Sequence, residues 1–355
     1  MELMSVLRAP WWRFWAIYLL AGLEAWAIWR NWPWFLPFTV YVLVPLLDLP
    51  ERNSWKPSAE TALFRLPLTL WLPVQTLVIL LLSWRVARIS PAWAPLQTFL
   101  WALSLGIVMA LGINVAHELN HKMHVMYRLL ARCLLIMAGY GPYAVEHNRG
   151  HHKNVGLAHD PATARPGESF YRFLPRAVRG VVMSPRTWPD ARERILLDTL
   201  AYGFILQLFA FACTLPWPAT ETMIETSRRS RYVHGLMVYL IGSAFGVFQL
   251  ELVNYVEHYG LQRMSPEEPV TAQHSWNNHH WLSGCLLFKL EYHSDHHLHA
   301  ARWYSRLENR PEEWPQHPAG LPAMMLLALV PPLWMAVMDP RAKRIRTATA
   351  SIPRS

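Results

Sequence analysis

Long apolar stretches alternate with polar segments along the chain, and the apolar stretches determine the predicted fold. A helix needs roughly 20 predominantly apolar residues to cross a bilayer. Six stretches approach this length: residues 11–29, 34–49, 63–84, 96–116, 195–217 and 233–256. Only residues 30–33 separate the first two, and the second is short, so these two are expected to form a tight helical hairpin. The pattern predicts an all-α integral membrane protein with about six transmembrane helices.

Two further apolar stretches differ from these six. Residues 129–145 contain two glycines and a proline, and residues 321–338 contain Pro331 and Pro332. Both are expected to form helices packed at the membrane interface. Residues 341–355 are basic and lack an apolar pattern. We therefore expect a single membrane domain over residues 1–340, followed by a short, flexible, basic tail over residues 341–355.

The composition supports a membrane protein and restricts its partners. Hydrophobic residues make up 53% of the chain and charged residues 16%, whereas soluble domains carry about 25% charged residues. The net charge is +9, but the basic residues are dispersed between the apolar stretches, which favours anionic lipid or an acidic protein partner over nucleic acid. With six spans, both termini and residues 122–194 lie on the same side of the membrane, and that side holds most of the Lys and Arg. The positive-inside rule therefore places both termini in the cytoplasm, together with a helical cap formed by the polar segments.

Cysteine chemistry is not indicated. The three cysteines, Cys133, Cys213 and Cys285, form no C-x-x-C pair. A disulfide framework, a cysteine-rich metal site and a fused rubredoxin-like module are all disfavoured.

The polar segments carry histidine clusters at helical spacing. The first holds His117 and His121, the second His147, His151 and His152, and the third His293, His296 and His297, with His258 at the end of the sixth apolar stretch. Residues i and i+4 share one face of a helix, so His117 and His121 can reach one site. By the same rule His147 and His151 are expected to share a face, with His152 one step around.

This density of histidine predicts a metal site. Charged imidazoles so close together would repel one another, whereas neutral imidazoles bound to a metal would not. Imidazole suits Zn, Cu, Fe and Ni. A single catalytic zinc takes about three protein ligands, so eight or nine histidines imply two metal ions. Iron is the preferred candidate because it suits oxygen activation, although the histidines alone leave the metal open. Carboxylates adjacent to the clusters are expected to orient the ligands by hydrogen bonds: Glu118, Glu146, Asp160, Glu257 and Asp295.

Four strings resemble a known family. The three clusters follow the His-box pattern of the membrane desaturase and hydroxylase superfamily. HELNHK (117–122), EHNRGHH (146–152), NYVEHYGL (254–261) and HSDHH (293–297) are similar to the motifs of alkane 1-monooxygenases. NYVEHYGL is the most discriminating, because desaturases lack it. DPATARPGES (160–169) and HSWN (274–277) also resemble that family.

The resemblance implies a catalytic di-iron centre held by nine histidines: His117, His121, His147, His151, His152, His258, His293, His296 and His297. It implies hydroxylation by O2 of the terminal methyl group of an n-alkane, which enters from the bilayer, to give a 1-alkanol. Electrons would come from NADH through rubredoxin reductase and rubredoxin, as separate chains. The enzyme would lie in the bacterial inner membrane with its active site facing the cytoplasm.

Several alternatives remain open at this level. Family members usually have Arg where this chain has Tyr292, so a xylene- or cymene-type methyl-arene monooxygenase is a second candidate. A fatty-acyl desaturase or hydroxylase would use the same irons. A metal transporter is disfavoured because transporters bind ions near the bilayer midplane, whereas these histidines lie at span ends. Glu24, inside the first apolar stretch, is either functional or paired with Arg30.

Overall fold

The computed structural model describes residues 11–51, 61–89, 94–215 and 227–350. Across these ranges the chain is helical, and the only pairings of extended backbone are two isolated bridges, Pro50 with His280 and Asn277 with Gln316. The predicted all-α fold is confirmed.

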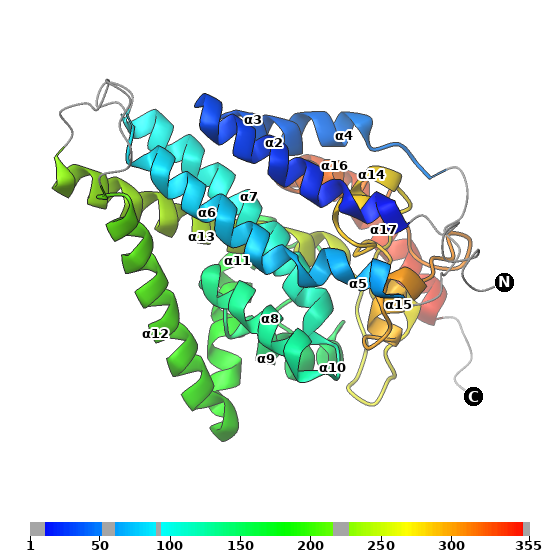
Figure 1. Cartoon of the computed structure of the whole chain (residues 1–355). Helices are drawn as coiled ribbons and strands as arrows, with labels where there is room; N and C mark the ends of the chain where they lie inside the picture. The colour runs from blue at the N-terminus through cyan, green and yellow to red at the C-terminus, as the bar shows by residue number, and fades with distance from the viewer. Residues whose placement is uncertain (1–10, 52–60, 90–93, 216–226, 351–355) are drawn as a thin grey trace.

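Four of the six predicted spans are helices long enough and apolar enough to cross a membrane. They are α5–α6 (Ala62–Thr69 and Trp71–Val86), α7 (Ala94–Asn120), α12 (Pro189–Ala212) and α13 (Arg228–His258). The last two residues of the predicted stretch 195–217 lie outside the described residues. In Figure 1, α6, α7 and α13 lie together in the centre and α12 leans away from them.

The first two predicted spans form the expected hairpin, but from shorter helices. A 3-10 turn (Trp11–Trp15) leads into α2 (Ala16–Arg30), and α3 (Phe35–Phe38), a π-helical turn (Thr39–Leu43) and α4 (Val44–Leu47) return beside it. Asn31 has the left-handed conformation (φ 60°), and Trp32 N donates to Ala27 O, which closes α2 by a Schellman motif.

Glycines let the two central helices approach closely. An ideal Cβ built on Gly106 of α7 would lie 2.8 Å from the carbonyl oxygen of Gly242 on α13, and one on Gly246 would lie 3.1 Å from Met109 Cβ. Small residues four apart permit such backbone contact between membrane helices. Because α7 ends near His117 and α13 ends at His258, this crossing sets the distance between two histidine-bearing ends.

The segments after α7 bring the second histidine cluster back beneath it. Helix α8 (Val125–Met137) stops at Gly139, whose φ of +73° allows Tyr140 N to donate to Leu135 O. Then follow α9 (Tyr143–Glu146), the π-helical turn η4 (His147–His151), α10 (His152–Asn154), α11 (Phe170–Met183) and η5 (Ser184–Thr187).

The segments after α13 carry the third cluster. They comprise η6 (Ala272–His274), α14 (Trp281–Leu286), α15 (His293–Leu298), η7 (Tyr304–Arg306), α16 (Leu321–Ala328) and α17 (Pro331–Ala350). The predicted apolar stretches 129–145 and 321–338 are thus helical, each interrupted. The prediction of a flexible tail is wrong for residues 341–350, because α17 continues through them and Arg346 Nη1 donates to Gly260 O. Residues 351–355 lie outside the described residues.

Candidate metal centre

The nine predicted histidines lie in two adjoining groups. Within each group every residue offers one ring nitrogen, and these nitrogens all lie within 4.8 Å of one another. The five-histidine group contains His117, His121, His147, His152 and His296, and the four-histidine group contains His151, His258, His293 and His297.

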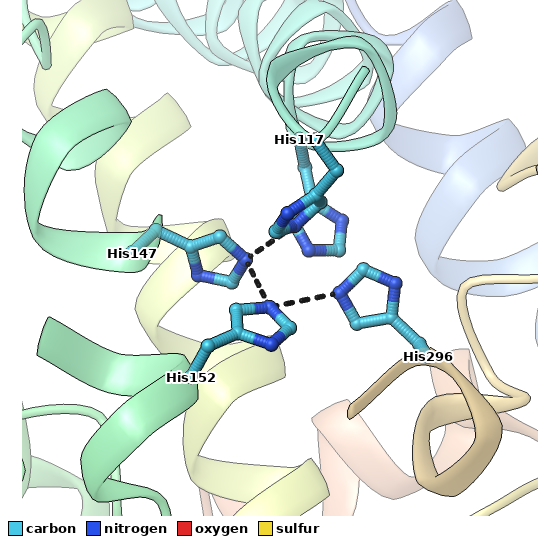
Figure 2. A group of neighbouring side chains, drawn as sticks. His117, His147, His152 and His296 are labelled. Carbon is cyan, nitrogen blue, oxygen red and sulfur yellow. Dashed lines mark hydrogen bonds between the residues drawn. The ribbon is translucent and has the colours of Figure 1, made fainter. Parts of the chain in front are cut away.

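The five-histidine group collects side chains from separate parts of the fold. His117 lies in the last turn of α7 and His121 directly follows that helix, while His296 comes from α15. The Nε2 atoms of His147 and His121 are 3.0 Å apart, those of His152 and His147 3.1 Å, and those of His296 and His152 3.2 Å. Figure 2 shows His147, His152 and His296 directed toward one another, with His117 above them.

The four-histidine group is fully buried and has the same character. His293 Nε2 lies 3.0 Å from His258 Nε2 and 3.1 Å from His297 Nε2. The ring of His151 is 4.7 Å from that of His258 and 4.8 Å from that of His297, between centroids. His258 Nδ1 is 3.3 Å from the carbonyl oxygen of His274, which leaves Nε2 facing the group.

A π-helical turn corrects one prediction from the sequence. His147 and His151 were expected to share a face, but they belong to different groups. Residues 147–151 form a π-turn, in which hydrogen bonds span five residues rather than four. His147 is therefore aligned with His152, and His151 points to the neighbouring group. In the regular helix α15 the i, i+4 rule holds, because His293 and His297 share a group.

Two of the five predicted carboxylates contact histidines of the groups. Asp160 Oδ2 lies 2.9 Å from His151 Nδ1, and Glu257 Oε2 lies 3.3 Å from His293 Nε2. The first contact is to the nitrogen opposite the group, as expected for a carboxylate that orients a metal ligand. Burial raises the pKa of the Asp160 carboxyl, but His151 and Thr163 outweigh it and hold the pKa below its usual value.

The other three carboxylates have different surroundings. Glu118 lies 2.9 Å from Lys122 Nζ and accepts from Tyr304 N. Asp295 accepts from Arg302 and lies 2.7 Å from Nδ1 of His299. These two brace the backbone around the site.

Glu146 is buried beside Asp160. Burial, and then the charge of Asp160, raise the pKa of Glu146 to about 8.

Thr163 is a residue of the site that the histidine pattern did not identify. Its hydroxyl donates to Asp160 Oδ2 at 2.6 Å and accepts from Gly156 N at 2.9 Å. A hydroxyl three residues after an aspartate is the only sequence signal, and such pairs are common in turns. Thr163 thereby holds the carboxylate that contacts His151.

The chemistry of the two groups fits metal ions. Burial, and then the neighbouring imidazoles, lower the pKa of His147, His152 and His296 well below the usual value, so the rings are neutral. A neutral imidazole has one N–H and one lone pair, and His147 Nε2 faces two other Nε2 atoms at once. His117 Nε2 and His151 Nε2 are buried and have no hydrogen-bond partner at all. A cation at the centre of each group would satisfy these nitrogens together.

A mostly apolar cavity of about 110 Å3 adjoins the histidines. His117, His147 and His293 line one end of it. The walls come from several helices and include Leu20, Val40, Tyr41, Val44, Ile107, Ala110, Leu111, Leu250 and Val253.

Comparison with known proteins gives a consistent assignment. The model of the fatty acid desaturase family matches residues 91–328. The chain is 34% identical over 313 residues to the alkane 1-monooxygenase of Ectopseudomonas oleovorans, covering 85% of this chain and 76% of that protein. It is 36% identical over 327 residues to alkane 1-monooxygenase 1 of Pseudomonas aeruginosa, covering 88% and 83%.

A relative with a different named substrate matches a smaller part of the chain. The hydroxylase component XylM of the xylene/toluene monooxygenase of Pseudomonas putida is 30% identical over 257 residues, covering 69% of this chain and 64% of that protein. The histidine groups, the cavity and these similarities lead to one conclusion: the chain belongs to the fatty acid desaturase family and, within it, to the alkane 1-monooxygenases.

Proposed function

We propose that this protein is a membrane monooxygenase that converts an n-alkane into the 1-alkanol. One oxygen atom of O2 enters the terminal C–H bond, and the other leaves as water after uptake of two electrons and two protons. The observation that carries the proposal is the position of both histidine groups at one end of an apolar cavity.

Two iron ions are the proposed cofactor, one for each histidine group. When bound, they would supply the activation of O2. His117, His121, His147, His152 and His296 would hold one ion, and His151, His258, His293 and His297 the other. The Asp160 carboxylate would orient His151 through Nδ1.

The chain itself would orient the hydrocarbon. Most of the cavity lining is apolar, so binding an alkane removes apolar surface from water or lipid. The relatives named alkane 1-monooxygenase match more of the chain than the xylene/toluene hydroxylase component does, which supports n-alkanes over methyl-arenes. A cavity that adjoins the histidines would let one terminal methyl approach the ions while the rest of the alkane lies between the helices.

The electron donor is proposed to be a separate protein, with NADH, rubredoxin reductase and rubredoxin in series. The three cysteines are free, and they lie apart in α8, after α12 and in α14. The distribution of Lys and Arg supports a cytoplasmic position for the site in a bacterial inner membrane.

Product analysis tests the proposal. Membranes containing the protein are incubated with NADH, rubredoxin, rubredoxin reductase, O2, n-alkanes and methyl-arenes, and the alcohols are identified by gas chromatography. We expect 1-alkanols, and about two irons per purified chain. Exposed His159, outside both groups, provides the control variant His159→Ala, which should retain iron and activity. Unsaturated acyl chains without any hydroxylated hydrocarbon, or zinc as the sole metal, would contradict the proposal.

A further inference from the structure

The segment His274–Asn277, which carries the HSWN string, supplies no histidine to either metal group. All four of its residues are buried, and the segment is hydrogen-bonded both to the end of α13 and to the start of α15. The polar groups of a buried segment have to pair within the protein. Its hydrogen bonds therefore show which parts of the metal centre the segment holds.

On the side of α13, the segment holds the residues around His258. His258 Nδ1 donates to the carbonyl oxygen of His274 at 3.3 Å, and Trp276 N donates to Glu257 O at 2.8 Å. The indole Nε1 of Trp276 also donates to Tyr259 O at 2.9 Å. Because a carbonyl oxygen can only accept, the first contact places the N–H of the neutral His258 ring on Nδ1 and leaves the lone pair of Nε2 for the group.

On the side of α15, Asn277 holds the first turn of the helix through Ser294. Asn277 Oδ1 accepts from Ser294 N at 2.9 Å, and Asn277 Nδ2 donates to Ser294 Oγ at 2.7 Å. The first N–H groups of a helix have no partner within the helix, and the residue before α15, Tyr292, provides no side-chain cap. Asn277 therefore caps α15 from another part of the chain, at the residue that directly follows His293.

The Asn277 side chain is fully hydrogen-bonded. Its second amide hydrogen is donated to Pro315 O at 2.9 Å, and the Ser294 hydroxyl donates to Ala272 O at 2.8 Å. Neither Asn277 nor Ser294 has exposed surface. A side chain without the amide would leave its partners buried and unpaired, which costs more free energy than the bonds themselves contribute. The contact with α15 therefore depends on an amide at this position.

The two helices joined by the segment serve the two histidine groups unequally. Helices α13 and α15 supply three of the four histidines in one group, His258, His293 and His297, but only His296 of the five in the other. A shift of α15 relative to α13 would therefore disturb mainly the four-histidine group.

We propose that Asn277 is a positioning residue for the four-histidine group, because it fixes the separation of His258 and His293, whose Nε2 atoms are 3.0 Å apart. The inference rests on the proposed function in taking this group as a metal site. It gives Asn277 no contact with substrate or metal.

The test measures iron in the purified, full-length protein and its variants. Asn277→Leu keeps the shape of the side chain and removes the amide. By chelator competition, we expect one of the two irons to bind about 10- to 100-fold more weakly and the other to be retained. In the Mössbauer spectrum, the component of one iron site should change while the other stays. Asn277→Asp keeps an oxygen for Ser294 N and should retain more of that iron than Asn277→Leu.

Two further variants and one further measurement complete the test. Ser294→Ala removes only the hydroxyl, so it should weaken the same iron less, and it takes the place of Asn277→Leu if that variant does not fold. Asn309→Leu is the matched control, because Asn309 Nδ2 donates only to Asn278 O and Gln316 Oε1, and it should leave both irons unchanged. Hydrogen exchange of the metal-free protein should become faster at residues 274–277 and 293–298 in Asn277→Leu, and stay unchanged at residues 105–116.

Three outcomes would overturn the inference: no loss of iron in Asn277→Leu, an equal loss of both irons, or the same loss in Asn309→Leu. If the wild type binds no iron, the proposed function fails, and the exchange rates still decide whether Asn277 holds α15 in place.

Discussion

His296 and His297 are adjacent in the sequence, but their imidazoles belong to different histidine groups. His297 shares its group with His293, one helical turn away, and their Nε2 atoms are 3.1 Å apart. Two residues that are adjacent in α15 therefore contribute to different histidine groups.

This arrangement predicts an unusual order of iron loss. His293→Ala/His297→Ala leaves two imidazoles in the four-histidine group, so we expect about one of two irons to be lost. His296→Ala/His297→Ala leaves four imidazoles in one group and three in the other, so it should retain more iron. Elemental analysis of purified variants measures the difference. Equal loss in both double variants would contradict the division into two groups.

Asp160 and Asp295 form a matched pair of buried carboxylates beside the site. Asp160 contacts His151, whereas Asp295 contacts His299 and Arg302, which lie outside both groups. Asp160→Asn should weaken iron binding about 10- to 100-fold, because the amide orients the imidazole less well than a carboxylate. Asp295→Asn should change iron affinity far less. Competition with a graded series of chelators reports both affinities, and similar losses would argue against an orienting role for Asp160.

Removing one charge of the buried ion pair between Lys122 and Glu118 should destabilise the protein more than removing both. Lys122→Met leaves Glu118 buried without its cation, at a cost of about 3–5 kcal/mol. Glu118→Gln/Lys122→Met should recover most of that loss, because the neutral side-chain amide still offers an oxygen to Tyr304 N. Arg149→Met breaks the exposed pair with Asp190 and should change stability far less. Thermal unfolding in detergent ranks the three variants, and a Lys122→Met protein as stable as Arg149→Met would refute the expectation.

The crossing of α7 and α13 should tolerate no added methyl group at Gly106. A Cβ there would lie 2.7 Å from Phe245 Cδ1 and 2.8 Å from Gly242 O, and the latter is backbone that cannot turn aside. We expect Gly106→Ala to lower stability by about 1–3 kcal/mol. Gly203 on α12 has nothing within 4 Å of its Cβ position, so Gly203→Ala should be neutral or raise stability by up to about 1 kcal/mol. The two variants are denatured under the same conditions. A Gly106→Ala protein that unfolds no earlier than Gly203→Ala would contradict this expectation.

Much of the fold could be anticipated from residue patterns, for physical reasons, and the resemblance to alkane 1-monooxygenases pointed to the nine histidines that lie together in the structure. The thickness of the bilayer sets how many apolar residues a spanning helix needs, so composition alone predicts α6, α7, α12 and α13. The division of the histidines was not visible, because it depends on the π-turn at residues 147–151, and no residue type marks such a turn. The surroundings of Glu24 were also hidden, since the sequence offered Arg30 as a partner and tertiary packing placed that side chain over tryptophan rings.

The contact between His152 and His296 closes a loop of 144 residues. A metal ion bound there would act on the chain as a reversible cross-link, comparable in effect to a disulfide across the same loop. It would reduce the conformational entropy of the unfolded chain, and its binding free energy would add to the stability of the folded form. Metal supply would then govern how long the protein survives in the membrane as well as whether it is active.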